Sequence, residues 1–265
     1  IDNEAEQGFD FDQDPGVSYG LNAGWNGKQR VFKRSKMGVM TADGLGYCGD
    51  EMAGQMIAGN DFNYPVEHAR AIATSNLYSI ASCSSEAILS GKVKMGKYPI
   101  VDLINGLERY DGYTPEYYKS FTPTMINKIE NYIHHGGRLL VSGSYIGSDM
   151  QTDEEKNFLA NTLKVQYQVS DSLKATPMVN GLGMNFDYYD KLNDKHYAAT
   201  HPDILAPIDG AICTMQYING ASAAVGYKGN GYGSFTMGFP FECIKNEQTR
   251  GQLMSGILKY LLGNK

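Results

Sequence analysis

Three side chains in this sequence are of the types that together carry out nucleophilic catalysis. Ser144 ends a short apolar run, Glu108 lies just beyond another, and His68 lies in a helical pattern earlier in the chain. A serine hydroxyl becomes a nucleophile when a histidine accepts its proton and a carboxylate orients that histidine. We therefore take Ser144 as the candidate nucleophile or oxyanion donor, His68 as the base, and Glu108 as the orienting or general acid. The alternatives are structural: a tight turn of small residues at Ser144, and a locally hydrogen-bonded helix residue at His68.

A strand–helix–strand pattern positions two of these side chains. Residues 100–104 form a short apolar run with β-branched side chains, which favours a buried strand. Residues 123–133 carry apolar side chains on one helical face, and Gly136 follows where a left-handed residue commonly ends a helix. Residues 138–144 predict a second buried strand. Such a unit has parallel strands and a right-handed crossover.

The carboxyl ends of these two strands form the predicted binding site, because ligands on open α/β sheets bind at that edge. Residues 105–109 and 142–149 should therefore lie side by side. The chain holds 19 tyrosines, and exposed tyrosine rings suit sugars; packing of the rings on the core is the alternative. The candidate ligand-binding residues of the two segments are Asn105, Arg109, Tyr145 and Asp149.

The remaining pattern predicts one α/β domain. Residues 1–60 are rich in Gly, Asp and Asn and are expected to form an irregular extension packed on residues 61–265. Residues 77–82 and 165–169 are further strand candidates. A hairpin over residues 221–239 and a final helix over residues 248–262 close the chain. Strands with interspersed helices predict a three-layer α/β sandwich.

Charge and composition exclude some classes of partner. The formal net charge is −6, which argues against nucleic acid, and no apolar run is long enough to span a membrane. The four cysteines show no CxxC spacing, so no zinc site is expected, and disulfides are left open.

One acidic motif raises the question of a metal. Asp10, Asp12 and Asp14 alternate before Gly16, and alternating carboxylates on a turn can converge on calcium. The spacing departs from an EF-hand, so a solvated acidic turn is the alternative. No other cofactor is expected.

Six segments of the sequence are considered together: 13–17, 60–65, 82–87, 135–144, 223–229 and 237–242. Taken in order, they resemble a domain of secreted bacterial proteins described as xanthan lyase-like, which often carry golvesin-type modules. The resemblance implies a class I glutamine amidotransferase-like fold with a mainly parallel, flavodoxin-like sheet. It also implies a secreted, periplasmic or cell-surface location beside neighbouring modules of a larger protein.

The resemblance leaves two functional hypotheses open. The amidotransferases carry a Cys nucleophile after a central strand, but residues 142–147 contain no Cys. The later His-x-Glu pair is also missing, because residues 239–242, which end in Glu242, contain no His. One hypothesis is a hydrolase or lyase that acts on extracellular polysaccharide or cell-wall glycan. The other is a non-catalytic glycan-binding or scaffold domain with a degenerate amidotransferase-like site.

Overall fold

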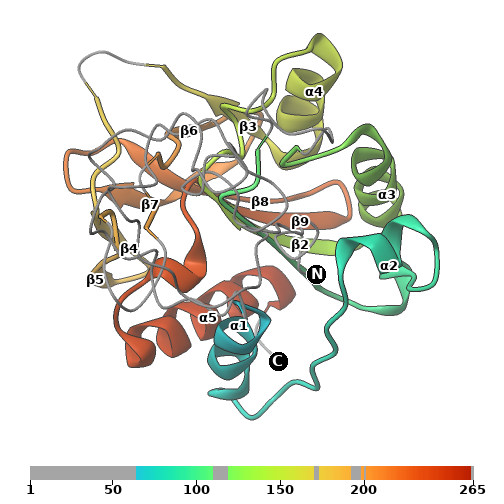
Figure 1. Ribbon diagram of the computed structural model, residues 1–265, viewed down its shortest axis with the longest axis horizontal. Coiled ribbons are helices and arrows are strands. Elements are labelled where there is room, and N and C mark those ends of the chain that lie inside the picture. The colour runs from blue at the N-terminus through green and yellow to red at the C-terminus, as the bar shows by residue number, and fades with distance from the viewer. Residues whose placement is uncertain (1–63, 110–118, 170–172, 192–197, 200, 264–265) are drawn as a thin grey trace, which may run out of the picture.

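The computed structural model describes residues 64–109, 119–169, 173–191, 198–199 and 201–263. In this part of the chain a curled β-sheet lies at the centre, with helices packed against it (Figure 1). The helices are α1 (Tyr64–Ala73), α2 (Ser85–Leu89), α3 (Pro123–His134), α4 (Asp153–Phe158) and α5 (Glu247–Leu262), with short turns η4 (Met95–Lys97), η5 (Leu159–Leu163) and η6 (Phe241–Cys243). The strands are β1 (Val101–Gly106), β2 (Arg138–Gly143), β3 (Val165–Tyr167), β4 (Met178–Gly181), β5 (Met184–Asp187), β6 (Leu205–Pro207), β7 (Ile212–Tyr217), β8 (Ser222–Gly229) and β9 (Tyr232–Met237).

The main sheet is mixed. Its seven strands follow the order β1-β2-β9-β8-β7-β4-β5, while β3 and β6 form a separate antiparallel pair. Strand β2 is parallel to β1 and β9, but the other four pairs of the main sheet are antiparallel. The prediction of a mainly parallel, flavodoxin-like sheet in a three-layer sandwich is therefore wrong. The reason is that three of these pairs, β4 with β5, β7 with β8 and β8 with β9, are joined by short turns, and strands joined by such turns pair antiparallel.

The predicted strand–helix–strand unit is confirmed as β1, α3 and β2. The two strands pair in parallel, with Val101 opposite Leu139. The Thr122 side chain caps α3 by accepting a hydrogen bond from the Met125 N–H. Gly136, with φ +83°, takes the left-handed conformation directly after the helix.

The side chains of β1 and β2 alternate between two apolar clusters. Leu103 and Val141 pack with the buried face of α3, whereas Ile104 and Leu140 pack with α1 and α5. Because side chains two positions apart share a face of a strand, Asp102 points to the same side as Ile104. An acidic group therefore faces α1.

The predicted C-terminal hairpin is confirmed as β8 and β9. Lys228 pairs with Gly233 next to a two-residue turn. Both turn residues have positive φ, +49° at Asn230 and +84° at Gly231, which matches the right-handed twist of paired strands. The predicted final helix follows as α5.

Other segments differ from the predicted pattern. Residues 77–82, a predicted strand, form none in the structure, and Leu77 there is 75% exposed. Only residues 165–167 of the predicted strand 165–169 pair, as β3. The predicted extension over residues 1–60 lies outside the described residues.

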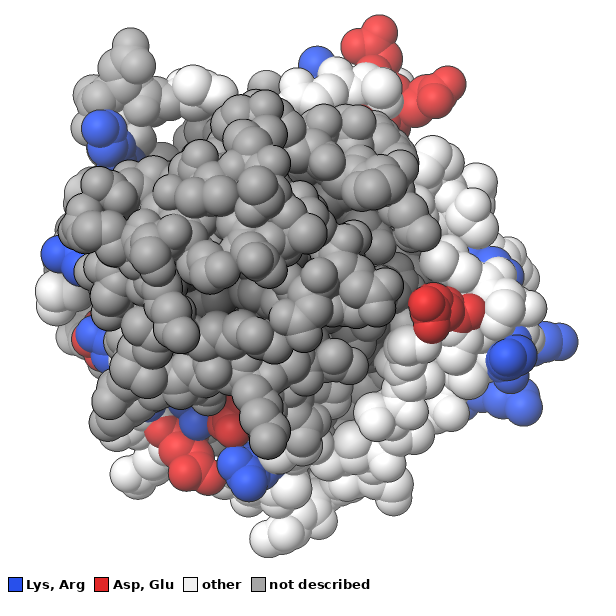
Figure 2. Space-filling model, viewed as in Figure 1, with Lys and Arg blue, Asp and Glu red and all other residues white. Residues whose placement is uncertain are grey.

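Helix α4 begins with a capping box. The Thr152 side chain accepts from the Glu155 N–H, and the Glu155 carboxylate accepts from the Thr152 N–H. The first turn holds Asp153 and Glu154 as well, which favours the helix because carboxylates offset its positive end. Figure 2 shows acidic side chains gathered over this end of α4, away from the basic ones near the loop after α2.

The close approach of Gly238 to the backbone before β6 gives a test of the fold. The Asp203 N–H donates to the Gly238 oxygen at 2.7 Å, and the Gly238 N–H donates to the Ala223 oxygen at 2.9 Å. A Cβ at position 238 would lie 2.3 Å from the backbone carbonyl oxygen of Asp203. Gly238→Ala should therefore lower the free energy of unfolding by about 1–3 kcal/mol, measured by urea denaturation.

Gly96 provides the matched control, because a Cβ there would meet no atom within 4 Å. We expect Gly96→Ala to change the free energy of unfolding by no more than about 0.5 kcal/mol. Equal midpoints for the two variants would contradict this packing.

Candidate functional site

The ends of β1 and β2 lie against each other, as the sequence predicted. The Ser144 N–H donates to the Gly106 oxygen at 2.8 Å. A Cβ at Gly143 would lie 2.9 Å from the Asn105 Cβ, so only glycine allows this approach without a shift. Residues 105–109 and 142–149 therefore form one edge.

Ser120, which the sequence did not single out, joins the two segments. Its Oγ lies 2.7 Å from the backbone carbonyl oxygen of Glu108 and 2.9 Å from that of Tyr145. The hydroxyl has a single hydrogen, so it donates to one of these oxygens at a time. Its N–H donates to the Asp149 carboxylate at 2.9 Å. Three of the predicted site residues, Glu108, Tyr145 and Asp149, therefore lie near one another around Ser120.

A stack of flat side chains lies at the same edge. The Arg109 guanidinium lies 4.8 Å from the centre of the Tyr145 ring, a cation–π distance. The same ring stacks on the exposed His201 imidazole, with the ring centres 6.0 Å apart. The stack runs from a half-buried arginine through a buried tyrosine to the surface.

Several polar atoms of this edge are buried without a hydrogen-bond partner in the described part of the chain. They are the Arg109 Nε, the Ser142 Oγ and the Ser144 Oγ. Most buried polar groups in proteins are paired, so a cluster of such atoms at one edge requires an explanation.

Asp203 is a further buried acid at this edge that the sequence did not indicate. Its carboxylate accepts from the Gly147 N–H at 2.7 Å and from the Ser148 N–H at 3.0 Å. Burial raises the pKa of Asp203 to about 7 and outweighs these two hydrogen bonds, which lower it. The carboxyl group therefore changes its charge near neutral pH and fixes the turn after Ser144 to the segment before β6.

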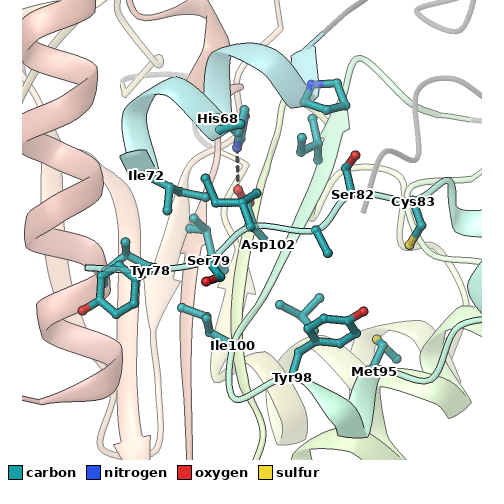
Figure 3. Close-up of a pocket in the computed structure, with 18 of the residues that line it drawn as sticks. His68, Ile72, Tyr78, Ser79, Ser82, Cys83, Met95, Tyr98, Ile100 and Asp102 are labelled. Carbon is teal, nitrogen blue, oxygen red and sulfur yellow. Dashed lines mark hydrogen bonds and ion pairs between the residues drawn. The ribbon is translucent and has the colours of Figure 1, made fainter. Parts of the chain in front are cut away.

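His68 lies between two carboxylates on the other side of β1. Its Nδ1 is 2.7 Å from the Asp102 Oδ2 (Figure 3). Its Nε2 is 3.1 Å from the Glu242 Oε2. Burial alone would lower the pKa of His68, but the Asp102 and Glu242 carboxylates outweigh it and raise the pKa to about 9. His68 is therefore an imidazolium at neutral pH with both N–H groups donated.

The structure does not hydrogen-bond the three predicted catalytic residues to one another. His68 contacts Asp102 and Glu242, while Ser144 is buried at the strand edge, and its Oγ meets no partner among the described residues. Glu108 is also buried at this edge and bonds Ser120 through its backbone oxygen. The catalytic roles of Ser144, His68 and Glu108 stay predictions.

The described part of the chain holds neither a cluster of metal ligands nor a membrane-spanning helix. Across the described ranges, no group of three or more His, Cys, Asp or Glu residues could hold a metal ion. The predicted calcium ligands Asp10, Asp12 and Asp14 lie outside those ranges. No helix that the structure describes is long and apolar enough to cross a membrane.

Comparisons with known proteins give only distant likenesses. No family model matches the chain, and no curated protein matches its sequence. An exo-beta-1,4-mannosidase from Opitutaceae bacterium strain TAV5 is similar in structure, with TM-score 0.48 and 9% identity over 77% of this chain and 32% of that one. A beta-galactosidase from Bacillus circulans sp. alkalophilus gives TM-score 0.47 and 12% identity over 74% of this chain and 26% of that one.

A cytoplasmic protein from Salmonella typhimurium is similar over 72% of this chain and 85% of that one, with TM-score 0.44 and 12% identity. Glycoside hydrolases are thus among the structural neighbours, and this chain spans about a third or less of the two described above. At such identities and TM-scores the likeness transfers no activity. The resemblance to xanthan lyase-like and amidotransferase-like proteins stays a prediction.

The buried charge of His68 makes stability depend on pH. Its pKa is raised from 6.5 to about 9, so its contribution is fully present below pH 6.5 and is lost as the pH rises through 9. The shift corresponds to about 3 kcal/mol. Urea denaturation between pH 7 and pH 10 should show His68→Gln less stable than the wild type at pH 7, with the difference shrinking toward pH 10.

His135 provides the matched control, because it is exposed and, within the described ranges, its Nδ1 bonds only the backbone oxygen of Asn131. His135→Gln should follow the wild-type pH dependence. A constant difference between wild type and His68→Gln over this pH range would show that His68 is not a buried imidazolium.

Proposed function

We propose that this chain is a non-catalytic, carbohydrate-related domain that binds a glycan at the strand edge formed by residues 105–109 and 142–149. The observation that carries the proposal is a set of buried donors that have no partner among the described residues and that lie beside the Arg109–Tyr145–His201 stack. Sugars present hydroxyl groups around a ring with an apolar face, so they match hydrogen-bonding groups next to flat side chains.

Both kinds of hydrogen-bonding group are present at this edge. The Arg109 Nε and the hydroxyls of Ser142 and Ser144 can donate to sugar oxygens. The carboxylates of Asp149 and Asp203 lie nearby and can accept from sugar hydroxyls. An extended polysaccharide outside the cell, at its surface or in the periplasm, fits this proposal, as does a place beside other modules of a larger protein.

Binding without cleavage is favoured over the hydrolase or lyase alternative. A serine nucleophile needs a base within hydrogen-bond reach, directly or through one water. The nitrogens of His68 are instead donated to Asp102 and Glu242, and a charged imidazolium has no lone pair with which to accept a proton.

The proposal predicts that Arg109→Ala weakens glycan binding by about tenfold or more, because a charged donor is lost. Calorimetric titration with xanthan, which is acidic, and with dextran, which is neutral, measures this loss. Arg70→Ala provides the matched control, since Arg70 is 60% exposed on α1 and pairs only with Glu67 of the same helix among the described residues.

The enzyme alternative is tested in the same samples by following the release of new reducing ends. We expect none from the wild type, and weaker glycan binding by Ser144→Ala because a hydrogen-bond donor to the sugar is lost. Product release that Ser144→Ala abolishes would replace the proposal with the hydrolase or lyase. No binding by the wild type, or equal losses for the two arginine variants, would also overturn it.

A further inference from the structure

A cavity of about 140 Å³ lies between α1, β1 and the extended segment 78–83 (Figure 3). Its walls are mainly apolar and include Ile72 from α1, Tyr78 and Ile80 from the extended segment, and Met254 from α5. It does not include the residues proposed above for glycan binding. The cavity is therefore a second, separate site.

The size of the cavity limits what it can hold. An apolar cavity of about 150 Å³ is large enough for a benzene molecule. The cavity here therefore accepts an apolar group of about that size. A sugar ring, which carries hydroxyls on all sides, would leave most of them against apolar walls without partners, at a cost of about 1–3 kcal/mol each.

One end of the cavity is polar. His68 and Asp102 line it together, and Figure 3 shows the two side chains joined across the top of the cavity. The N–H groups of His68 are donated to Asp102 and Glu242, so His68 has no donor left for a ligand. A carboxylate accepts at about four positions, so Asp102 is the member of the pair that can bind a ligand, as an acceptor.

The charges at this end of the cavity favour a ligand with a positive charge. The imidazolium of His68 is already paired with two carboxylates, and the residues that line the cavity include no Lys or Arg. An anionic ligand would therefore meet the Asp102 carboxylate with no cationic group to pair with. An ammonium group can instead donate hydrogen bonds to the Asp102 carboxylate. Such bonds are favoured because hydrogen bonds between charged groups are stronger than those between neutral groups. The hydroxyls of Ser79 and Ser82, which also line the cavity, can accept from the same group.

We propose that this cavity binds a small primary amine whose apolar part is about the size of a benzene ring, with its ammonium group donating to Asp102. The apolar part lies against Ile72, Tyr78 and Met254. This site is independent of the glycan edge, so either proposal can fail without the other.

Benzylamine is the probe, titrated into the full chain at pH 7 and followed by calorimetry. Benzyl alcohol and phenylacetate keep the ring and change only the charge of the polar group. We expect saturable binding of benzylamine, at least tenfold weaker binding of benzyl alcohol, and no binding of phenylacetate. Equal binding of benzylamine and benzyl alcohol, stronger binding of phenylacetate, or no binding of benzylamine would overturn the proposal.

Two variants locate the site. Asp102→Asn should weaken benzylamine binding at least tenfold. Asp187→Asn should leave the binding unchanged, because Asp187 lies at the end of β5 in an exposed ion pair with Lys245. Ala81→Phe places a ring into the cavity from an exposed position outside any helix or strand, so it should block binding without unfolding the protein. Benzylamine binding that survives both Asp102→Asn and Ala81→Phe lies elsewhere and overturns the assignment.

Discussion

The double ion pair of His68 is the interaction on which much of the structure depends. It joins α1 to β1 across 34 positions of sequence and to η6 across 174 positions. Burying charges costs several kcal/mol per ion unless each is paired, so the three side chains must enter the interior together. The edge of the Phe241 ring against the imidazole, with centres 4.8 Å apart, closes one side of the cluster. The position of α1, and with it one wall of the cavity, therefore follows from an electrostatic constraint.

Strand β1 supplies both of the sites discussed above. Its Asp102 faces α1 and the cavity, while its last residues and the segment after it form the strand edge with Ser144 and Tyr145. The edge depends on small residues: a Cβ at Gly147 would lie 2.7 Å from the Tyr167 Cβ. Ser144 thus lies in a turn that must be compact, which agrees with the structural alternative for this residue.

The sequence predicted the elements whose signals are local. Apolar periodicity and end signals located β1, α3, β2 and α5, and the turn at Asn230 located the last hairpin. The order of strands could not be read in this way, because pairings such as β2 with β9 depend on contacts between distant segments. The partners of His68 were missed for the same reason. A signal for them was nevertheless present, since Asp102 and Glu242 are single acids within apolar runs, and acids in such positions are seldom buried without a partner.

Strand β9 lies at the boundary between the parallel and the antiparallel parts of the main sheet. It lies antiparallel to β8 on one side and parallel to β2 on the other. Closing the two-residue turn at Asn230 and Gly231 costs little chain entropy, whereas bringing β2 to β9 closes a loop that includes β3 to β8. The hairpin can therefore form early and offer β9 as a ready edge, onto which the strand–helix–strand unit docks. In such an order of assembly, a later part of the chain provides the template on which an earlier part docks.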